Sequence, residues 1–265
     1  MNMADPPRTV LISGCSSGIG LQLAVQLARD PRQRYQVNNA GVGLVGPLEG
    51  LSLTSMQKVF DTNFFGAVRL VKAVLPGMKR RRQGHIVVVS SVMGLQGVVF
   101  NDVYAASKFA LEGFFESLAV QLLQFDIFVS LVEPGPVATD FEGKLLEQVS
   151  AAEPPGADPD TLHYFRDLYL PASRELFRSL GQSPEDVAQG STPQVIVKVI
   201  SSASPPLRRQ TNARYSPLTA LKAADPSGSL YVRTAHRLLF RWPRLLGLGL
   251  RCLACGCLRS RVWPR

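Results

Sequence analysis

The sequence predicts an α/β fold, a doubly wound Rossmann-like parallel sheet. Short apolar runs rich in Val and Ile, typical of strands buried on both faces, alternate with longer segments of helical periodicity. A glycine-rich turn stands directly between the first such run and the first helix. Strands that alternate with helices favour a parallel sheet covered by helices on both faces. With 265 residues, the chain is long enough for one such domain and an appendage.

The elements follow in a regular order. The first strand is predicted at 9–14 ("TVLISG"), and the helix after it, 20–30, carries apolar residues at helical spacing that predict one buried face, Leu21, Ala24, Val25 and Ala28. The remaining elements are a long helix at 55–78 ended by Pro76-Gly77, a strand at 84–91, a helix at 103–125 and a strand at 127–135 ended by Pro134-Gly135.

After Thr139 the pattern becomes irregular up to residue 180, with aromatic and Leu residues among Pro and Gly. Residues 139–182 are interpreted as a substrate lid over an apolar ligand, and surface helices that bury their own apolar stripe are the alternative. Residues 183–202 then predict a helix capped by Ser183 and interrupted by "GSTP".

Charge divides the chain into two parts. The net charge is +9, but residues 1–207, the predicted sheet domain, carry −2 and residues 208–265 carry +11. A basic C-terminal extension indicates an anionic partner, and a membrane surface is favoured over nucleic acid because its basic residues alternate with leucines rather than with stacking aromatics. No apolar run approaches the roughly 18 residues of a membrane span.

Helical projection supports a membrane-surface role for this extension. Its arginines share one stripe, apolar residues lie mostly opposite, and neighbouring cysteines are candidates for S-acylation. A disordered basic tail and a zinc site are the alternatives, and "CLACGC" offers three sulfurs without a nearby fourth ligand, so no metal site is predicted. The residues concerned are Arg233, Arg237, Arg241, Arg244 and Arg251, opposite Leu239, Trp242, Leu245, Leu246 and Leu250, beside Cys252, Cys255 and Cys257.

The turn "GCSSGIG" predicts a dinucleotide site. Gly14 permits the sharp turn, Gly18 lets the backbone approach a pyrophosphate, and Gly20 lets the helix pack closely on the strand. The first N–H groups of the helix then point toward the phosphates.

Tyr104 and Lys108 predict acid–base chemistry. At spacing i and i+4 they share a helix face, and a nearby ammonium lowers a phenol pKa from about 10 toward neutral pH. Ser91 ends the preceding strand, where its hydroxyl could polarise the same carbonyl. The three together are far more specific than any one alone.

These motifs, in this order, resemble the signature of the short-chain dehydrogenase/reductase family. It consists of Gly14-x3-Gly18-x-Gly20, "NNAG" (38–41), Asn63, Ser91, Tyr104-x3-Lys108 and "PGPVAT" (134–139). The resemblance implies that Tyr104 exchanges the proton, Ser91 stabilises the oxyanion, Lys108 holds the nicotinamide ribose and Asn63 belongs to a proton relay. It further implies cofactor contacts by Gly14, Ser16, Ser17, Gly18, Ile19, Gly20, Asn39, Ala40, Gly41, Tyr104, Lys108, Pro134, Gly135, Val137 and Thr139.

Within that family, the chain is most similar to enzymes that act on all-trans-retinol and on 17β-hydroxysteroids, through stretches such as "FDTNFFGAVRLVKAVLPGMKRRRQGHIVVVSSVMGLQG" and "DPSGSLYV". The resemblance implies a lipophilic substrate, NADP(H) in preference to NAD, and visual-cycle retinal reduction, with a steroid alcohol as the alternative. It also implies a homodimer through the long helices and a location on the cytoplasmic face of a membrane, in the photoreceptor outer segment.

One stretch departs from the family pattern. In "RYQVNNAG" (34–41) the end of the family's fourth strand follows almost directly on the first helix, so about 50 residues, or two strand–helix units, are missing between Val37 and Asn38. The acidic or basic residue that reads the ribose 2′ position is lost with them.

Closure of this gap predicts a damaged cofactor site. "RYQV" is expected to replace the fourth strand beside the first. The first helix must then cross with left-handed connectivity, seen in about 2% of such units, or move to the other face of the sheet. Either way an apolar sheet edge is exposed. A catalytically impaired variant that acts only as a binding partner is therefore a second hypothesis.

Overall fold

The computed structural model describes residues 10–27, 35–139, 156–188, 195–213 and 215–242, together with residues 245 and 249. Part of the predicted lid, the helix interruption at 190–193 and the three C-terminal cysteines lie outside these residues.

A parallel sheet organises the described residues, which confirms the predicted fold class. Its strands stand side by side in chain order, and "RYQV" takes the predicted place, because Val37 pairs with Ile12 on one side and with Val87 on the other. The five strands are β1 (Val10–Ile12), β2 (Tyr35–Asn38), β3 (Gly84–Val89), β4 (Ile127–Glu133) and β5 (Arg208–Gln210). The sheet therefore includes the first three residues of the predicted C-terminal extension.

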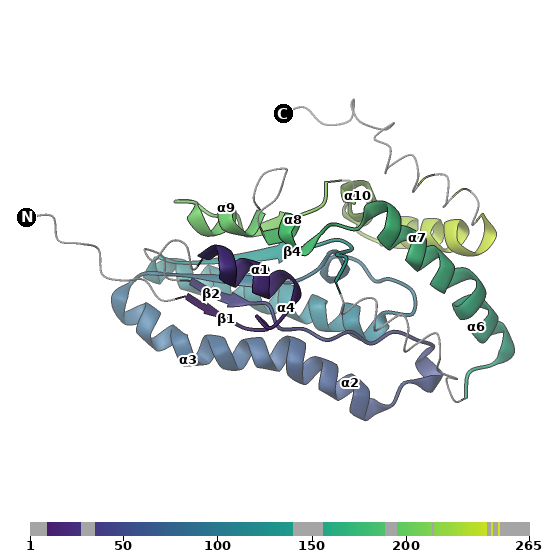
Figure 1. Cartoon of the computed structure of the whole chain (residues 1–265), viewed down its shortest axis with the longest axis horizontal. Helices are drawn as coiled ribbons and strands as arrows, with labels where there is room; N and C mark the ends of the chain where they lie inside the picture. The colour runs from purple at the N-terminus through teal and green to yellow at the C-terminus, as the bar shows by residue number, and fades with distance from the viewer. Residues whose placement is uncertain are drawn as a thin grey trace, which may run out of the picture.

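Helices cover both faces of the sheet (Figure 1). On one face α1 (Gly18–Leu27), α8 (Pro184–Ala188) and α9 (Val195–Ser201) bury Leu23, Val187 and Ile196 against β2, β3 and β4. On the opposite face α3 (Gly66–Arg81) and α4 (Asp102–Leu122) bury another cluster, which includes Val71, Leu111, Phe115, Ile86 and Leu131.

The position of α1 decides how the gap closes. All strands are parallel and succeed one another in one direction, so the hand of each connection depends only on which face its helix covers. Since α1 lies on the face opposite α3 and α4, the β1–α1–β2 connection has the opposite hand to β2–α3–β3 and β3–α4–β4. Of the two routes expected from the sequence, the chain keeps α1 on the face opposite α3 and α4, the route for which a left-handed connection is expected.

The predicted buried face of α1 is wrong. Leu23 and Leu27 are buried against α8 and α9, whereas Leu21 and Val25 are 40% and 45% exposed. The helix has two apolar faces, and contact with α8 and α9 selects the second. The first remains an exposed apolar surface beside the edge strand β1.

The predicted end of the long helix is also wrong. The helix runs through α2 (Leu53–Phe60), the π-turn η2 (Asp61–Phe65) and α3, and it continues past Pro76 until Arg82 adopts a left-handed conformation with φ 48°. Met78 explains the extension, because it is buried under Gly84, where an added Cβ would lie 2.7 Å from its sulfur. Tertiary packing here overrides the helix-breaking tendency of proline.

Helices also replace the irregular structure predicted before residue 180. Among the described residues, α6 (Pro159–His163), the π-turn η5 (Tyr164–Tyr169) and α7 (Leu170–Leu180) form one helical rod, and Phe165 is fully buried. Ser183 caps α8 as predicted, since the Asp186 N–H donates to its Oγ. The shorter elements are η1 (Leu48–Gly50), η3 (Val92–Gly94), η4 (Leu123–Phe125), α10 (Ser216–Ala224), α11 (Ser229–His236) and the π-turn η6 (Arg237–Arg241). Within the described ranges no helix is long and apolar enough to cross a membrane.

Candidate active site

The glycine turn has the geometry that a pyrophosphate requires. Gly14 and Gly18 have φ of 65° and 55°, the left-handed region that favours glycine. Helix α1 begins at Gly18, so its first N–H groups face the turn. A Cβ on Gly20 would lie only 2.3 Å from the Gly14 carbonyl oxygen, which confirms the tight packing predicted for this glycine.

Hydrogen bonds join this turn to the "NNAG" loop despite the missing residues. The Ser13 hydroxyl accepts from the N–H groups of Asn39 and Ala40 at 3.1 and 3.2 Å, and the Asn39 side chain donates to the Gly14 carbonyl at 3.0 Å. Ser13 was not among the predicted site residues. Its signal is a hydroxyl one position before the first glycine, too common a feature to single out.

We expect Gly20→Ala to destabilise the protein by at least about 2 kcal/mol, because the Gly14 carbonyl and the Asn39 side-chain amide leave no room for a methyl group. Chemical denaturation measures this loss. Gly113→Ala is the matched control, since an added Cβ there has no neighbour within 4 Å on the exposed side of α4, and a small gain in stability is expected. Equal stabilities of the two variants would contradict the close packing at Gly20.

Helix α4 brings Tyr104 and Lys108 together as predicted. The Lys108 Nζ lies 5.5 Å from the centroid of the Tyr104 ring and donates to the Val89 carbonyl at 3.0 Å, which ties α4 to the end of β3. Burial lowers the pKa of the Lys108 ammonium to about 8, and the Glu112 carboxylate opposes this shift.

Ser91 lies immediately beyond β3. Its hydroxyl caps η3 by accepting from the Met93 N–H at 3.1 Å, and it lies 3.5 Å from the Pro134 carbonyl after β4. The carboxyl ends of β3 and β4 thus place Ser91 beside the "PGPVAT" segment, where the resemblance expects it.

Asn63 lies in the π-turn η2, a type of helix distortion common at functional sites. Its amide is 1% exposed, accepts from the Val42 N–H at 2.7 Å and donates to the Val42 carbonyl and the Ser107 hydroxyl at 2.9 Å each. Asn63 therefore links the loop after Gly41 to α4, at a point of α4 that lies between Tyr104 and Lys108 in the sequence. The relay role expected of it stays a prediction.

One cavity of about 1100 Å³ collects the predicted residues at the carboxyl ends of the strands. Asn63 and Gly20 lie behind its wall rather than on it. Its lining includes Gly14, Ser16, Ser17, Gly18, Ile19, Asn39, Ala40, Gly41, Ser91, Tyr104, Lys108, Pro134, Gly135, Val137 and Thr139.

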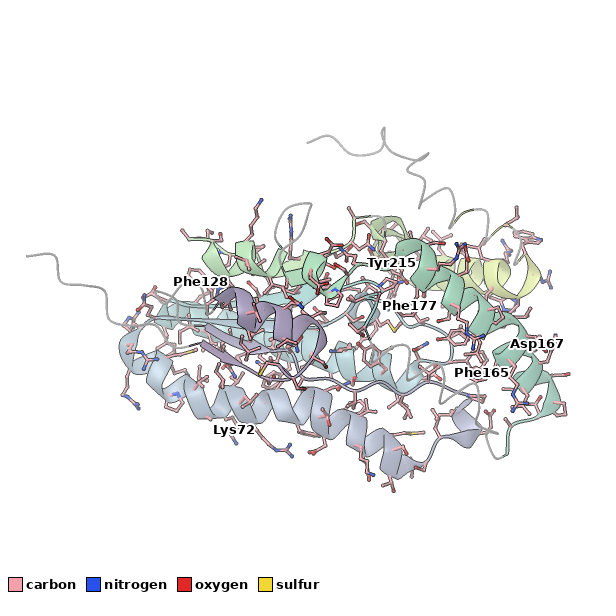
Figure 2. The ribbon with its side chains drawn as sticks, viewed as in Figure 1. Lys72, Phe128, Phe165, Asp167, Phe177 and Tyr215 are labelled. Carbon is pink, nitrogen blue, oxygen red and sulfur yellow. The ribbon has the colours of Figure 1, made fainter. Side chains whose placement is uncertain are left out.

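The other half of the cavity is mainly apolar and was largely missed by sequence reasoning. Phe177 of α7 and Tyr215, just before α10, both line it (Figure 2). Leu176 of α7, the loop after Ser91 and the C-terminal helix (α11 with η6) complete the lining. The residues of the loop and the C-terminal helix are Val98, Val99, Tyr231, Ala235, Leu238 and Leu239. The helical rod η5–α7 buries apolar side chains of its own, as the alternative interpretation expected, and also lines the cavity. The role of this segment as a substrate lid stays a prediction.

The C-terminal helix, which consists of α11 and η6, covers the cavity with one side and exposes arginines on the other. An Asx turn starts it, since Asp225 accepts from the N–H groups of Ser227 and Leu230. Arg233, Arg237 and Arg241 are exposed, while Leu239, predicted to insert into lipid, lines the cavity. The motif "DPSGS" followed by helical spacing was the available signal for this element. Membrane contact and dimerisation stay predictions.

The profile of a family described as short chain dehydrogenase matches residues 34–150. The chain is 70% identical to retinol dehydrogenase 8 of Bos taurus over 317 positions, which cover 99% of this chain and 100% of the relative. It is 39% identical to 17-beta-hydroxysteroid dehydrogenase type 1 of Homo sapiens, over 87% and 85% of the two chains. A Burkholderia phymatum short-chain dehydrogenase/reductase solved in complex with NAD has a TM-score of 0.65 at 21% identity, over 85% and 96% of the two chains.

The alignment with the bovine relative bears on the missing segment. It runs over 317 positions, at least 52 more than the 265 residues of this chain can fill. That difference agrees with the predicted loss of about 50 residues, the length of two strand–helix units.

Proposed function

Because the chain belongs to the short-chain dehydrogenase family, whose members are oxidoreductases, we propose that it interconverts all-trans-retinol and all-trans-retinal with NADP(H). The carrying observation is the position of Tyr104, Ser91 and Lys108 in one cavity, between a glycine turn for pyrophosphate and an apolar half for a long hydrocarbon. The 70% identity to a protein named retinol dehydrogenase 8 supports the retinoid over the steroid.

The residues suit carbonyl reduction. The Tyr104 hydroxyl gives its proton to the substrate oxygen, and the Ser91 hydroxyl donates a hydrogen bond to the same oxygen as negative charge develops there. Lys108, held by the Val89 carbonyl, supplies the positive charge that makes the phenol a better acid. The bound nicotinamide supplies the hydride. In the reverse direction Tyr104 takes the proton from the alcohol.

Turnover with retinal tests the proposal. Purified protein is incubated with NADPH and all-trans-retinal, and retinol is quantified by chromatography, with estrone as the steroid arm. Preferential conversion of retinal is expected. Preferential conversion of estrone would favour the steroid reaction, and no conversion of either would contradict an enzymatic function for this chain.

A binding role without catalysis is the second candidate, and the fold gives it a specific basis. The opposite hand of the α1 connection and the exposed Leu21 and Val25 place the phosphate turn beside an open sheet edge. Retinol binding followed by tryptophan-to-retinoid energy transfer separates the two. Binding with no turnover favours the non-catalytic role.

A further inference from the structure

Behind the Tyr104–Lys108 pair, helix α4 carries two acids at the same four-residue spacing, Glu112 and Glu116. This spacing keeps all four side chains on one slowly turning face of the helix. Lys108 and Glu112 are 3% and 5% exposed, so bulk water screens their interaction weakly. The face of α4 that bears Tyr104 and Lys108 therefore continues along the helix as a line of charged groups.

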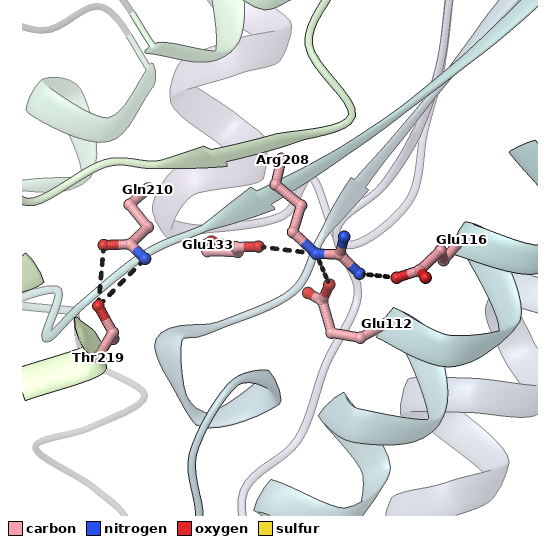
Figure 3. Close-up of polar contacts among 6 residues, drawn as sticks. All are labelled: Glu112, Glu116, Glu133, Arg208, Gln210 and Thr219. Carbon is pink, nitrogen blue, oxygen red and sulfur yellow. Dashed lines mark hydrogen bonds and ion pairs between the residues drawn. The ribbon is translucent and has the colours of Figure 1, made fainter. Parts of the chain in front are cut away.

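One guanidinium contacts both acids of this line (Figure 3). Arg208, from β5, donates through Nε to Glu112 Oε2 at 3.0 Å and pairs through a terminal nitrogen with Glu116. Its Nε also lies 3.6 Å from Glu133 Oε1 at the end of β4. Arg208 thus ties the Glu112 carboxylate of α4 to β5.

Burial and ion pairing both act on the acids of this cluster. Burial, reinforced by the Glu112 charge, raises the pKa of Glu133 to about 8, so Glu133 is mainly protonated at neutral pH. Burial also raises the pKa of Glu112, and its contacts with Ser90 and Arg208 oppose that rise, so the Arg208 guanidinium favours the carboxylate form of Glu112. Glu116 is 55% exposed, so Glu112 is the acid whose charge bears most strongly on Lys108.

Glu112 is also packed against the loop that carries Ser91. A Cβ on Gly94 would lie 2.8 Å from the Ser90 hydroxyl and 2.9 Å from Glu112 Cγ, so these groups leave no free space between them. Only glycine fits at position 94. Glu112 therefore contacts the η3 turn that Ser91 caps as well as the helix that bears Lys108.

We propose that the Arg208–Glu112 ion pair is a positioning element of the active site, which holds a buried carboxylate one helical turn behind Lys108 and keeps that lysine protonated. The alternative is that the pair only ties β5 to α4. The proposal rests on the proposed function in giving Lys108 a role in the reaction. Among the described residues, the titratable groups around Lys108 and Glu112 are Tyr104, Glu116, Glu133 and Arg208.

The stability of the protein reports the protonation of Lys108 without any substrate. The folded-state pKa of Lys108, about 8, lies below its ordinary value of 10.5, so the unfolded chain binds more protons between these values. Unfolding free energy therefore rises with pH across this window, and Lys108→Met removes that rise. Denaturation from pH 6 to pH 10 measures the unfolding free energy of the chain and of its Lys108→Met variant. The difference between the two free energies gives the pH at which the rise begins.

When Glu112 is replaced by Gln, the rise in unfolding free energy is expected to begin about one pH unit lower, because the Lys108 ammonium loses its counter-charge. Glu116→Gln is the matched control: it also removes a partner of Arg208, but from an exposed site, and the onset stays in place. Glu112→Asp keeps the charge on a shorter arm and gives an intermediate onset, which covers the case of an unfolded Glu112→Gln variant. An unchanged onset in both Glu112 variants, or equal shifts for Glu112→Gln and Glu116→Gln, overturns the proposal.

Kinetics give the functional arm. In the Glu112→Gln variant, the alkaline limb of the pH profile of kcat/KM for retinal is expected to move to lower pH, as the onset of the stability rise does. If the Arg208–Glu112 pair has only a structural role, the variant loses activity equally at every pH. If no variant, including the parent, turns over retinal, the proposed function fails while the stability onset still decides the role of Glu112.

Discussion

Replacing Tyr104 with phenylalanine is expected to lower kcat/KM for retinal reduction by at least about 100-fold, since proton transfer by a positioned side chain contributes roughly 10² to 10⁴-fold. The substitution removes one oxygen atom and leaves the ring that faces the Lys108 ammonium. Binding of a retinoid is therefore expected to stay within about threefold of the parent protein. Steady-state kinetics at neutral pH, together with a retinoid binding titration, measure the two effects separately.

Tyr215→Phe is the matched control for this experiment. Tyr215 also lines the cavity, and its hydroxyl accepts a hydrogen bond from Gln96, so the control removes a cavity hydroxyl away from the Lys108 pair. Its turnover is expected to change by less than about tenfold. The pair of variants is also made in a chain with the intervening residues of the bovine relative restored between Val37 and Asn38. Turnover of Tyr104→Phe within threefold of its parent in either chain would remove Tyr104 from the reaction.

Local motifs made the catalytic half of the site predictable. A helix places residues four apart on one face, and a parallel sheet brings the ends of its strands to one edge, so Tyr104, Lys108 and Ser91 could be grouped from spacing and order alone. The pairing of "RYQV" beside β1 followed from the neighbour relation of the first and fourth strands. The first inference depends on geometry that extends over a few residues, and the second depends on the strand order that the family resemblance implies.

Features that depend on packing between distant segments were not predictable. Met78 under Gly84 keeps α3 helical beyond Pro76, and contact with α8 and α9 chooses Leu23 over Leu21 as the buried side of α1. The C-terminal helix is an instructive case, because an apolar stripe opposite arginines suits a membrane and a protein cavity equally well. Periodicity shows that a face is buried, and it does not show what buries it.

The sheet order explains why the cofactor site is expected to be incomplete. In a doubly wound sheet a dinucleotide lies across the point where the strand order reverses, with one half over each set of strands. Here the order of the described strands runs from β1 to β5 without a reversal, and β1 is the edge. In the proposed site, Tyr104, Lys108 and Thr139 would hold the nicotinamide end, and the glycine turn would hold the pyrophosphate. Beyond β1, no described strand supports the adenosine half.

Reduced nicotinamide mononucleotide is therefore expected to bind this chain within about tenfold of the affinity of NADPH. The adenosine and its 2′-phosphate can add only what an open sheet edge offers, and tenfold corresponds to about 1.4 kcal/mol. The preference for NADPH over NADH is likewise expected to be small, less than about tenfold, since the position about 20 residues beyond the glycines that reads the ribose is missing. Titration of nicotinamide fluorescence with each of the three ligands measures these ratios.

The restored chain, with the bovine relative's residues between Val37 and Asn38, is the control in which the adenosine half regains its strands. There NADPH is expected to bind at least about 100-fold more tightly than the mononucleotide, a difference of about 2.7 kcal/mol. Because the glycine turn and Tyr104 are the same in both chains, the change in ratio isolates the missing strands. A 100-fold preference for NADPH in the present chain would mean that β1 and the turn alone hold the whole dinucleotide, and that the rare hand of the α1 connection leaves the cofactor site intact.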